Sequence, residues 1–505
     1  MIALRRLLAD RWIAVAAALL VGAIAGGIGA IVAPRGPVTT GQALFAMGLA
    51  FVTGLIGGGL IRSRWAILPI ALIQLAAFEV GRAGTVGPTV DALRLDTPYG
   101  IIALIISRGL HGFLNLLPLA FGVLVGIALA RRIASTAEDA PYDPRGRPVG
   151  TALVGVVTLA LVALVAMPAS TPPVLGADGA PIPGSISELT TVRLGGADQA
   201  VMIRAASPDK PVLLYLSGGP GQSDVAFSRV FTSGWVNDFV FVDLEQRGNG
   251  KSYPAIDPVS SMTLDRAVAD VIELTDYLRE RFDEEKIYLL GESWGTILGV
   301  LAVQERPDLF YAWIGSGQMV DIVETDQKIY MDLVAYAQRS GDADLAARLV
   351  AMGEPPYRDI PWSNSNVLGW YDYLYKSYTP SDGYIARGEA AGLDPFGVIG
   401  SEYSFIEKTN VLRGLIDTFS LMYPQLYGLD LRESAARLEV PVWMLDGAAE
   451  LEGRRSIALD WFEKLDAPSK ECVTYQGAAH SVAFEQADEV QRLLNDVIVP
   501  ATYGR

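Results

Sequence analysis

Charged and titratable residues are scarce in this sequence, and some kinds are almost missing. Only 19% of its 505 residues are charged, whereas 51% are hydrophobic. Such a chain is neither disordered nor fibrous, because it can bury enough apolar surface to offset the entropy lost on folding. The single cysteine, Cys472, excludes any disulfide within the chain. The two histidines, His111 and His480, leave few choices for an imidazole base.

Lysine is absent from the first third of the chain. The residues up to Met167 include 13 Arg and 7 Asp or Glu, a balance of +6, whereas the remainder has 27 Lys or Arg and 49 Asp or Glu, a balance of −22. The acidic part disfavours nucleic acid as a partner, since phosphate binding needs positive charge. The change near Met167 divides the chain into two regions of different character.

Long apolar runs fill the first region. A helix needs about 20 residues to cross the hydrocarbon core of a bilayer. We therefore expect an all-α transmembrane region over residues 1–168, with the lipid bilayer as its partner. Its five helices are predicted near residues 12–33, 42–61, 65–80, 109–130 and 149–167. The third run is short and carries Gln74 and Glu79, so its crossing depends on the arginine pattern.

The arginines between the runs predict the orientation, because cytoplasmic loops are enriched in Lys and Arg. Three loops on one side hold Arg5, Arg6, Arg11, Arg62, Arg64, Arg131, Arg132, Arg145 and Arg147, whereas the other side has Arg35, Arg82 and Arg94. Two of the arginine-rich loops flank the third and fourth runs, so both runs must cross. The pattern predicts a cytoplasmic N-terminus and places the chain after Met167 outside the cytoplasm.

Arg108 and His111 are ionisable residues close to the apolar fourth run. An ionisable residue inside a membrane is a functional candidate by default. The interpretation that we favour is that the fourth helix begins near Gly109. Both residues then lie at the outer interface, and residues 101–107 form a lip on it.

The second region begins with a Pro-, Gly- and Ala-rich stretch that predicts a linker over residues 169–186. The domain that follows, of about 320 residues, is large enough for one core with an insertion. Buried strands are predicted at residues 212–216, 239–244, 287–290, 311–314, 440–445 and 471–475. Helical patterns alternate with them, as at residues 264–278 after the N-cap Thr263. The fold class is therefore α/β, with a mainly parallel sheet and helices on both faces.

The alternation of strands and helices stops between residues 320 and 437. Helices are predicted at 324–340 and 342–352, followed by an aromatic run, without a convincing strand. We expect a helical lid over 320–437, which divides the core into residues 187–319 and 438–505. A lid of this kind lies over the carboxyl ends of the strands, where ligands bind in open α/β sheets.

Residues 291–295, Gly-Glu-Ser-Trp-Gly, lie between a predicted strand and a predicted helix. This is the setting of a G-x-S-x-G nucleophile elbow, in which a sharp turn exposes the serine hydroxyl. Ser293 is therefore the predicted catalytic nucleophile. A serine needs a base, usually a histidine. Because His111 belongs to the membrane region, the base is predicted to be His480.

The third catalytic residue must be an acid that precedes His480 on a loop after a strand. The loop after residues 440–445 offers Asp446, Glu450 and Glu452. We favour Glu450, because the Gly-Ala-Ala turn before it can carry the carboxylate toward the histidine loop. Asp446 is the alternative.

Two backbone N–H groups are expected to bind the oxyanion that develops during acyl transfer. One belongs to Trp294, the residue after the nucleophile. The other is assigned to Gly219, in the loop Ser-Gly-Gly-Pro-Gly at residues 217–221. Glycines there let the backbone approach a substrate.

From about Leu213 onward, the chain resembles the proline iminopeptidase branch of the α/β-hydrolases. The family's His-Gly-Gly-Pro-Gly loop corresponds to residues 217–221, with serine in place of histidine. Its Asp-Gln-Arg-Gly-x-Gly-x-Ser motif corresponds to residues 245–252, which begin with glutamate, and its Gly-Gly-Ser-Trp-Gly elbow has Glu292 in second place here. The family's acid lies four residues after a His-Gly at the end of the last core strand, which supports Glu450.

The resemblance implies an α/β-hydrolase that removes N-terminal residues from peptides, with lid carboxylates that hold the substrate's free amine. Asp372 and Glu402 are the candidates in this lid. No metal or organic cofactor is expected. Two alternatives stay open: an esterase or amidase acting on small acyl compounds, and a non-catalytic receptor that uses a hydrolase fold to bind a ligand.

Overall fold

The computed structural model describes residues 10–91, 93–135, 148–375, 377–392 and 397–503. Its chain divides into two compact units. The helical unit comprises Met1–Asp96, Gly100–Pro168 and Ser404–Thr409, and the sheet unit comprises Thr97–Tyr99, Ala169–Tyr403 and Asn410–Arg505. The main boundary, after Pro168, lies beside the change in composition near Met167.

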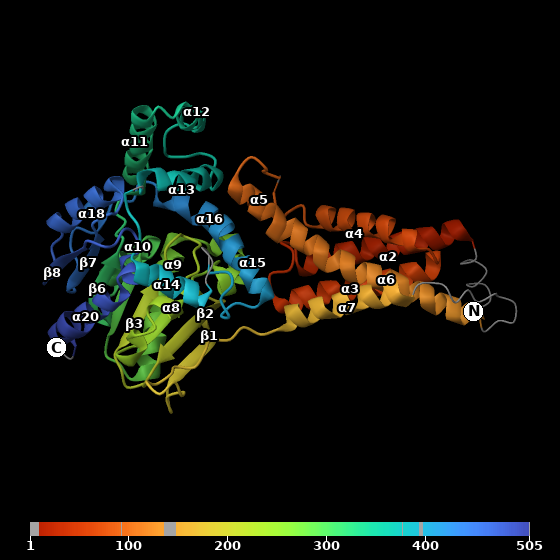
Figure 1. Ribbon diagram of the computed structural model, residues 1–505, viewed down its shortest axis with the longest axis horizontal. Helices are drawn as coiled ribbons and strands as arrows, with labels where there is room; N and C mark the ends of the chain where they lie inside the picture. Colours follow the sequence, from red (N-terminus) through yellow and green to blue (C-terminus); the bar gives the residue numbers. More distant parts are fainter. Residues whose placement is uncertain (1–9, 92, 136–147, 376, 393–396, 504–505) are drawn as a thin grey trace. The chain divides into compact units, whose positions relative to one another are not determined.

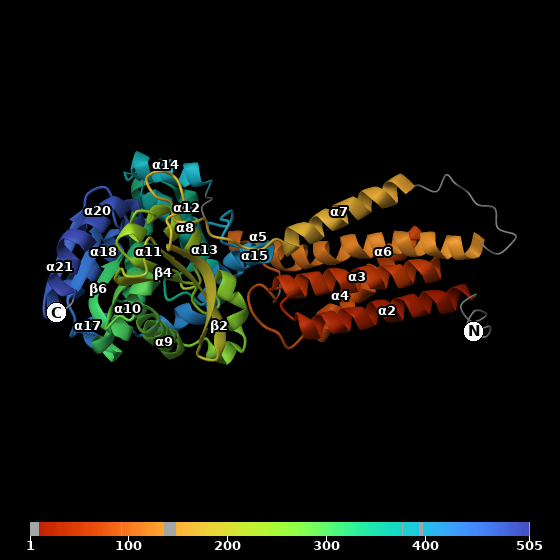
Figure 2. The ribbon, with the colours of Figure 1, turned by 90° about the horizontal axis from the view of Figure 1, so that it is seen from below.

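Long apolar helices make up most of the helical unit (Figures 1 and 2). They are α2 (Arg11–Val32), α3 (Thr40–Ile61), α4 (Ile67–Gly81) after the single turn η1 (Arg64–Ala66), α5 (Pro98–Leu104), α6 (Leu110–Ser135) and α7 (Pro148–Ala166). Within the described residues, five helical segments are long and apolar enough to cross a membrane. Their number and approximate positions agree with the predicted spans.

The helices of this unit approach one another closely at glycines. A Cβ atom on Gly26 of α2 would lie 2.2 Å from the carbonyl oxygen of Gln74 in α4. One on Gly58 of α3 would lie 2.2 Å from the carbonyl oxygen of Val123 in α6. Small residues of this kind let apolar helices pack by direct backbone contact.

The fourth apolar segment begins earlier than predicted. Helix α5 starts at Pro98, and the π-helical turn η2 (Ile105–Gly109) joins it to α6. Residues 101–107 are therefore helical and do not form a lip before the helix. Proline is favourable at the first position of a helix, where its missing N–H would have no acceptor. Pro98 is the sequence signal for this earlier start.

Arg108 lies within this helical segment, where several groups compensate its charge. Its guanidinium donates hydrogen bonds to the carbonyl oxygens of Val90 and Asp91 and pairs with Glu79 at 3.3 Å.

Four of the arginines that predict the orientation lie outside the described residues: Arg5, Arg6, Arg145 and Arg147.

An eight-stranded sheet forms the centre of the sheet unit (Figure 1). Its strands are β1 (Ile186–Leu194), β2 (Ala197–Ala205), β3 (Val212–Leu216), β4 (Val240–Leu244), β5 (Ile287–Glu292), β6 (Phe310–Ser316), β7 (Val442–Gly447) and β8 (Lys470–Tyr475). They lie in the order β1-β2-β4-β3-β5-β6-β7-β8, and β3 to β8 pair in parallel. The six predicted strands are all present. The antiparallel hairpin of β1 and β2 was not predicted, because polar residues interrupt both strands.

Helices cover both faces of the sheet, which confirms the predicted fold class. Leu213 and Tyr215 of β3 join the main apolar cluster with residues of α8 (Val225–Phe231) and α20 (Ala487–Leu493). On the opposite face, α9 (Leu264–Phe282) contacts β1 and β3, and α10 (Trp294–Glu305) contacts β3, β5 and β6; neither helix joins that cluster. Further short elements are η3 (Trp235–Asn237), η4 (Gly250–Ile256), η5 (Val259–Ser261), η6 (Pro307–Leu309), α18 (Glu452–Lys464), α19 (Val482–Glu485), η9 (Leu494–Ile498) and α21 (Val499–Thr502).

Only helices and loops lie between β6 and β7 in the part of the chain that the structure describes. They are α11 (Ile322–Ser340), α12 (Ala343–Met352), α13 (Trp362–Leu374), α14 (Asp382–Ala391), α15 (Phe405–Arg413), the π-helical η7 (Gly414–Thr418), α16 (Phe419–Met422), η8 (Tyr423–Leu426) and α17 (Leu431–Ser434). Helices α11 to α13 share their own apolar cluster. We call this insertion the lid.

The stretch predicted as a linker, residues 169–186, belongs to the sheet unit and packs within it. Val174 is buried in the main apolar cluster, and its carbonyl accepts a hydrogen bond from the Ile182 N–H. The guanidinium of Arg204, in β2, donates to the carbonyl oxygen of Pro172. A low content of large apolar residues did not prevent this stretch from packing.

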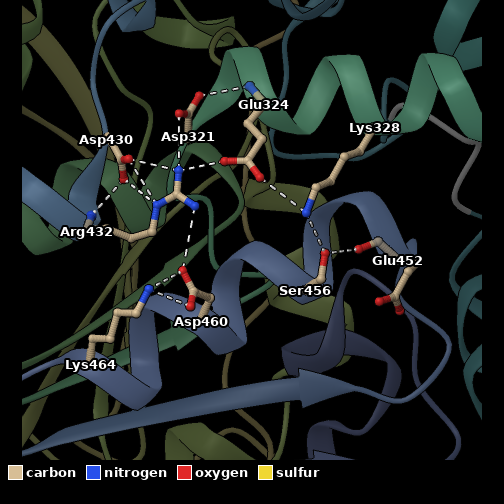
Figure 3. A network of polar contacts seen from close by, with 9 residues as sticks. All are labelled: Asp321, Glu324, Lys328, Asp430, Arg432, Glu452, Ser456, Asp460 and Lys464. Carbon is tan, nitrogen blue, oxygen red and sulfur yellow. Dashed lines mark hydrogen bonds and ion pairs between the residues drawn. The ribbon is translucent and has the colours of Figure 1, made fainter.

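Arg432 connects the start of the lid to the core through several carboxylates (Figure 3). Its Nη2 atom lies 2.6 Å from Glu324 and 2.8 Å from Asp430, and its Nη1 atom lies 3.6 Å from Asp460 in α18. Asp321 is a fourth partner, at 3.5 Å. The guanidinium therefore balances acidic groups from three parts of the chain.

Replacing Arg432 with alanine should destabilise the protein, because the acidic groups around it would then repel one another. Its side chain is only 21% exposed, and we expect a loss of about 2 kcal/mol of unfolding free energy. The measurement is the thermal unfolding of the full chain in detergent. Arg437→Ala is the control, since that side chain is 70% exposed and its carboxylate partners lie 3.8 Å away. Equal Tm values for the two variants would contradict the prediction.

Candidate active site

The turn after β5 holds the predicted nucleophile in a strained conformation. Ser293 has φ +53° and ψ −119°, a combination that L-residues rarely adopt. A Cβ atom on Gly295 would lie 2.2 Å from the carbonyl oxygen of Leu216, and one on Gly291 would lie 2.4 Å from that of Gly295. Both glycines are therefore required by close packing, as a nucleophile elbow demands.

Ser293 lies at a cavity of about 430 Å³ between the sheet's carboxyl edge and the lid. His480 and Gly219 line the same cavity, together with Asp326 from α11 and Arg454 from α18. This volume is within the range of small-molecule sites, about 300–1,000 Å³. The structure thus brings the predicted nucleophile, base and oxyanion loop to one cavity.

Glu450 lies directly against the imidazole of His480. Its Oε2 atom contacts Nδ1 of His480, and its Oε1 atom accepts hydrogen bonds from the Leu451 N–H at 2.7 Å and the Tyr375 hydroxyl at 2.9 Å. Nη1 of Arg454 lies 2.9 Å from Oε1. Burial alone would raise the pKa of Glu450, but the charges of Arg454 and His480 and these hydrogen bonds hold it well below its usual value. The carboxylate is therefore ionised.

Asp446, the alternative acid, is engaged elsewhere. Its two oxygens accept hydrogen bonds from Arg455, each at 2.8 Å, and one also accepts from the Thr474 hydroxyl. The turn after β7 explains the difference, because Glu450 donates its N–H to the carbonyl of Gly447 and is carried around to His480.

The oxyanion loop is fixed to the elbow by Gln246. The Gln246 side chain donates to the carbonyl oxygen of Ser217 at 3.0 Å and accepts from the indole N–H of Trp294 at 2.9 Å. Gly219 has φ +110°, which favours glycine. Trp294 is the first residue of α10, and the first N–H groups of a helix have no acceptor within it. The backbone conformation at Gly219 and the position of Trp294 at the start of α10 are therefore compatible with their predicted role as oxyanion donors.

Glu292 departs from the family pattern of the elbow. Its side chain connects the elbow to the histidine loop. Its Oε1 atom accepts a hydrogen bond from the Ser481 hydroxyl at 2.8 Å. Burial, with the negative charge of Asp224, raises the pKa of Glu292 well above its ordinary value. Glu292 is therefore hydrogen-bonded to the residue that directly follows the predicted base.

The two lid carboxylates suggested by the resemblance do not line the cavity. Asp372 is exposed on α13. Glu402 is fully buried and forms an ion pair with Arg229. Neither position offers a free carboxylate to a molecule beside Ser293.

Asp326 is a cavity carboxyl that we did not predict. Its side chain is 8% exposed, and the Tyr423 hydroxyl donates to it at 2.9 Å. Burial raises the pKa of Asp326 to about 7, although the Tyr423 hydrogen bond lowers it. The sequence held a signal, because Asp326 lies four residues after Ile322 and three before Ile329, on the buried stripe of α11.

Residues 212–341, which include the elbow, match the protein family described as serine aminopeptidase, S33. The chain has the α/β-hydrolase fold. As an enzyme it is a serine hydrolase, which agrees with the predicted class. Within the described ranges, no group of three or more His, Cys, Asp or Glu residues is arranged to hold a metal ion.

This hydrolase is 27% identical to the probable aminopeptidase YbaC of Bacillus subtilis over 304 residues, 60% of this chain and 93% of the relative. Among solved structures, a proline iminopeptidase-related protein from Thermus thermophilus is 17% identical with a TM-score of 0.42, over 63% of this chain and 98% of that one. A proline iminopeptidase from Mycobacterium smegmatis is 15% identical with a TM-score of 0.39, over 62% and 97% of the two chains.

Proposed function

We propose that this hydrolase is a membrane-anchored aminopeptidase that removes N-terminal residues from peptides outside the cytoplasm. The observation that carries the proposal is one cavity in which Ser293 and His480 occur with the buried carboxyl group of Asp326, while Glu450 supports His480 from behind. The first two supply acyl-transfer chemistry, and the third supplies a partner for a free amine.

In the proposed reaction, Ser293 Oγ attacks the scissile carbonyl carbon while His480 takes the hydroxyl proton. The oxyanion is held by the N–H groups of Trp294 and Gly219. Collapse of the tetrahedral intermediate breaks the peptide bond, and His480 gives its proton to the leaving amine. Water then attacks the acyl-enzyme with His480 as base, releasing the N-terminal residue and restoring Ser293. Glu450 fixes the imidazole and stabilises its charged form.

A free N-terminal amine is positively charged near neutral pH and needs an acceptor inside a cavity closed by the lid. Asp326 faces that cavity, and its partner Tyr423 donates a hydrogen bond that stabilises the ionised carboxylate. Substrate recognition is therefore assigned to Asp326 in place of Asp372 and Glu402.

A substrate panel tests the activity. We expect turnover of aminoacyl amides with a free amine and none of the same compounds after N-acetylation. Turnover of short-chain esters alone would favour the esterase or amidase alternative. Equal turnover of free and acetylated compounds would exclude recognition of the amine.

The role of Asp326 predicts how KM depends on pH. Below its pKa of about 7 the carboxyl group is protonated and cannot pair with an ammonium group, so KM for aminoacyl amides should rise as pH falls. Asp326→Asn should lower kcat/KM at pH 8 about 10- to 100-fold and remove this pH dependence of KM. Asp344→Asn is the control, because that lid carboxylate is 83% exposed. An unchanged KM profile in Asp326→Asn would contradict the assignment.

The five apolar segments and the arginine pattern support the membrane anchor and its orientation. Protease added to intact cells should remove a tag at the C-terminus, because the hydrolase region is proposed to face outward. A tag at the N-terminus should stay protected until the cells are opened. Protection of the C-terminal tag would reverse the proposed orientation.

A further inference from the structure

A second cavity, of about 280 Å³, lies entirely within the helical unit. Helices α2, α3, α4 and α6 supply its lining, which is mostly Ala, Leu, Gly and Phe. None of the described lining residues is Lys, Arg, Asp or Glu. The cavity is close to the lower limit of small-molecule pockets, about 300 Å³, and so suits one slender molecule.

A chain of side-chain hydrogen bonds crosses one wall of this cavity. Asn115, in α6, donates its Nδ2 hydrogen to the backbone carbonyl of His111 at 2.8 Å. Its Oδ1 atom accepts a hydrogen bond from Nε2 of Gln74, in α4, at 3.2 Å. The acceptor at the end of this chain is Oε1 of Gln74, which is buried without a hydrogen-bond partner in a side chain only 8% exposed.

The orientation of the two amides follows from their neighbours. Asn115 has to present its NH₂ group to the His111 carbonyl, so its oxygen faces Gln74. Gln74 then has to present its own NH₂ group to that oxygen, so the Oε1 atom of Gln74 is left without a donor. Exchanging nitrogen and oxygen in either amide would set two acceptors or two donors against each other.

None of the described neighbours of the leftover oxygen donates a hydrogen bond to it. The backbones of α2 and α4 are in direct contact at Gly26 and Gln74, which limits rearrangement there. The other amide in the lining, Gln42, already accepts from the Val38 N–H and donates to the Val32 carbonyl. A buried acceptor without a partner is unfavourable, and most of all in an apolar helix bundle.

We propose that this cavity binds a neutral single-chain lipid with a hydroxyl group, which donates its hydrogen bond to Oε1 of Gln74. The apolar lining accepts the aliphatic chain, and the absence of Lys, Arg, Asp and Glu from the described lining disfavours a fatty acid anion or an alkylamine. A volume of about 280 Å³ is too small to hold two long chains together. This proposal does not depend on the aminopeptidase activity.

The test uses the full chain in nanodiscs and a medium-chain fatty alcohol that carries a photoreactive diazirine. We expect crosslinks to peptides of α2, α4 or α6, with competition by the unlabelled alcohol but not by the alkane or fatty acid of equal length. Equal competition by the alkane would show an apolar crevice only. Stronger competition by the fatty acid, or no crosslink at all, would likewise overturn the proposal.

Two variants test separately the hydrogen bond to Gln74 and the volume of the cavity. Gln74→Leu keeps the volume but removes the acceptor, and should lower crosslinking at least tenfold. Gly29→Leu places a side chain in the cavity, where a Cβ would meet only Phe78 at 3.5 Å, and should do the same. Gly48→Leu is the control, because a Cβ there meets no atom within 4 Å. Wild-type crosslinking in monodisperse Gln74→Leu protein would overturn the proposal, and the competition result with wild-type protein stands whether or not a variant folds.

Discussion

Replacement of Glu450 by glutamine is expected to lower kcat about 10⁴-fold, as the loss of the acid does in other triads. The amide cannot stabilise the imidazolium of His480, and it presents an NH₂ group that favours the wrong tautomer. Arg454, whose Nη1 atom lies 3.1 Å from Nδ1 of His480, would then oppose the positive charge without a carboxylate to offset it. Steady-state kinetics with an aminoacyl amide measures the effect.

Asp446→Asn is the matched control, since it removes a carboxylate at the end of β7, four residues before Glu450. Asp446 pairs with Arg455 and Thr474, so its loss should reduce stability and leave kcat within about twofold of wild type. A large fall in kcat for Asp446→Asn, with near-normal kcat for Glu450→Gln, would reverse the assignment of the acid.

The residues proposed for catalysis are easier to find in the sequence than those proposed for substrate recognition. The residues at the catalytic end of the cavity follow from local rules: a strained turn needs glycines beside Ser293, and only one histidine lies outside the apolar region. These rules involve neighbours in sequence or simple counts. These rules can therefore be applied to a sequence without knowing how the lid packs.

Substrate-binding groups depend on which lid residues face the cavity, and that is decided by long-range packing. Glu402 fits the role by sequence position, but it forms an ion pair with Arg229 from α8. Asp326 is hard to predict, because a single carboxylate in a helical pattern usually lies on the solvated face. The sequence does not predict the β1–β2 hairpin for a related reason: its polar residue Arg204 is buried by Thr171 and Pro172, which are distant in sequence.

Replacement of Ser293 by alanine should lower kcat by about 10⁶-fold, the largest effect expected of any single change in this protein. An active-site phosphonate should form an adduct with wild-type protein and none with the variant, which mass spectrometry detects directly. Ser340→Ala is the control, because that exposed serine lies at the end of α11, where its hydroxyl bonds only to carbonyls of its own helix. A retained adduct in Ser293→Ala would place the nucleophile elsewhere.

The same variant separates an enzyme from a receptor. Alanine removes only the hydroxyl oxygen, so the cavity and Asp326 stay in place and a non-cleavable substrate analogue should bind with a Kd close to that of wild type. Loss of turnover with retained binding is the pattern of an enzyme that has lost a bond-forming atom. If folded wild-type protein bound the analogue but formed no phosphonate adduct, the receptor alternative would stand. The strained turn argues against that outcome, because a backbone conformation that costs free energy at Ser293 is explained by the exposure of a nucleophile and has no evident use in a passive binding site.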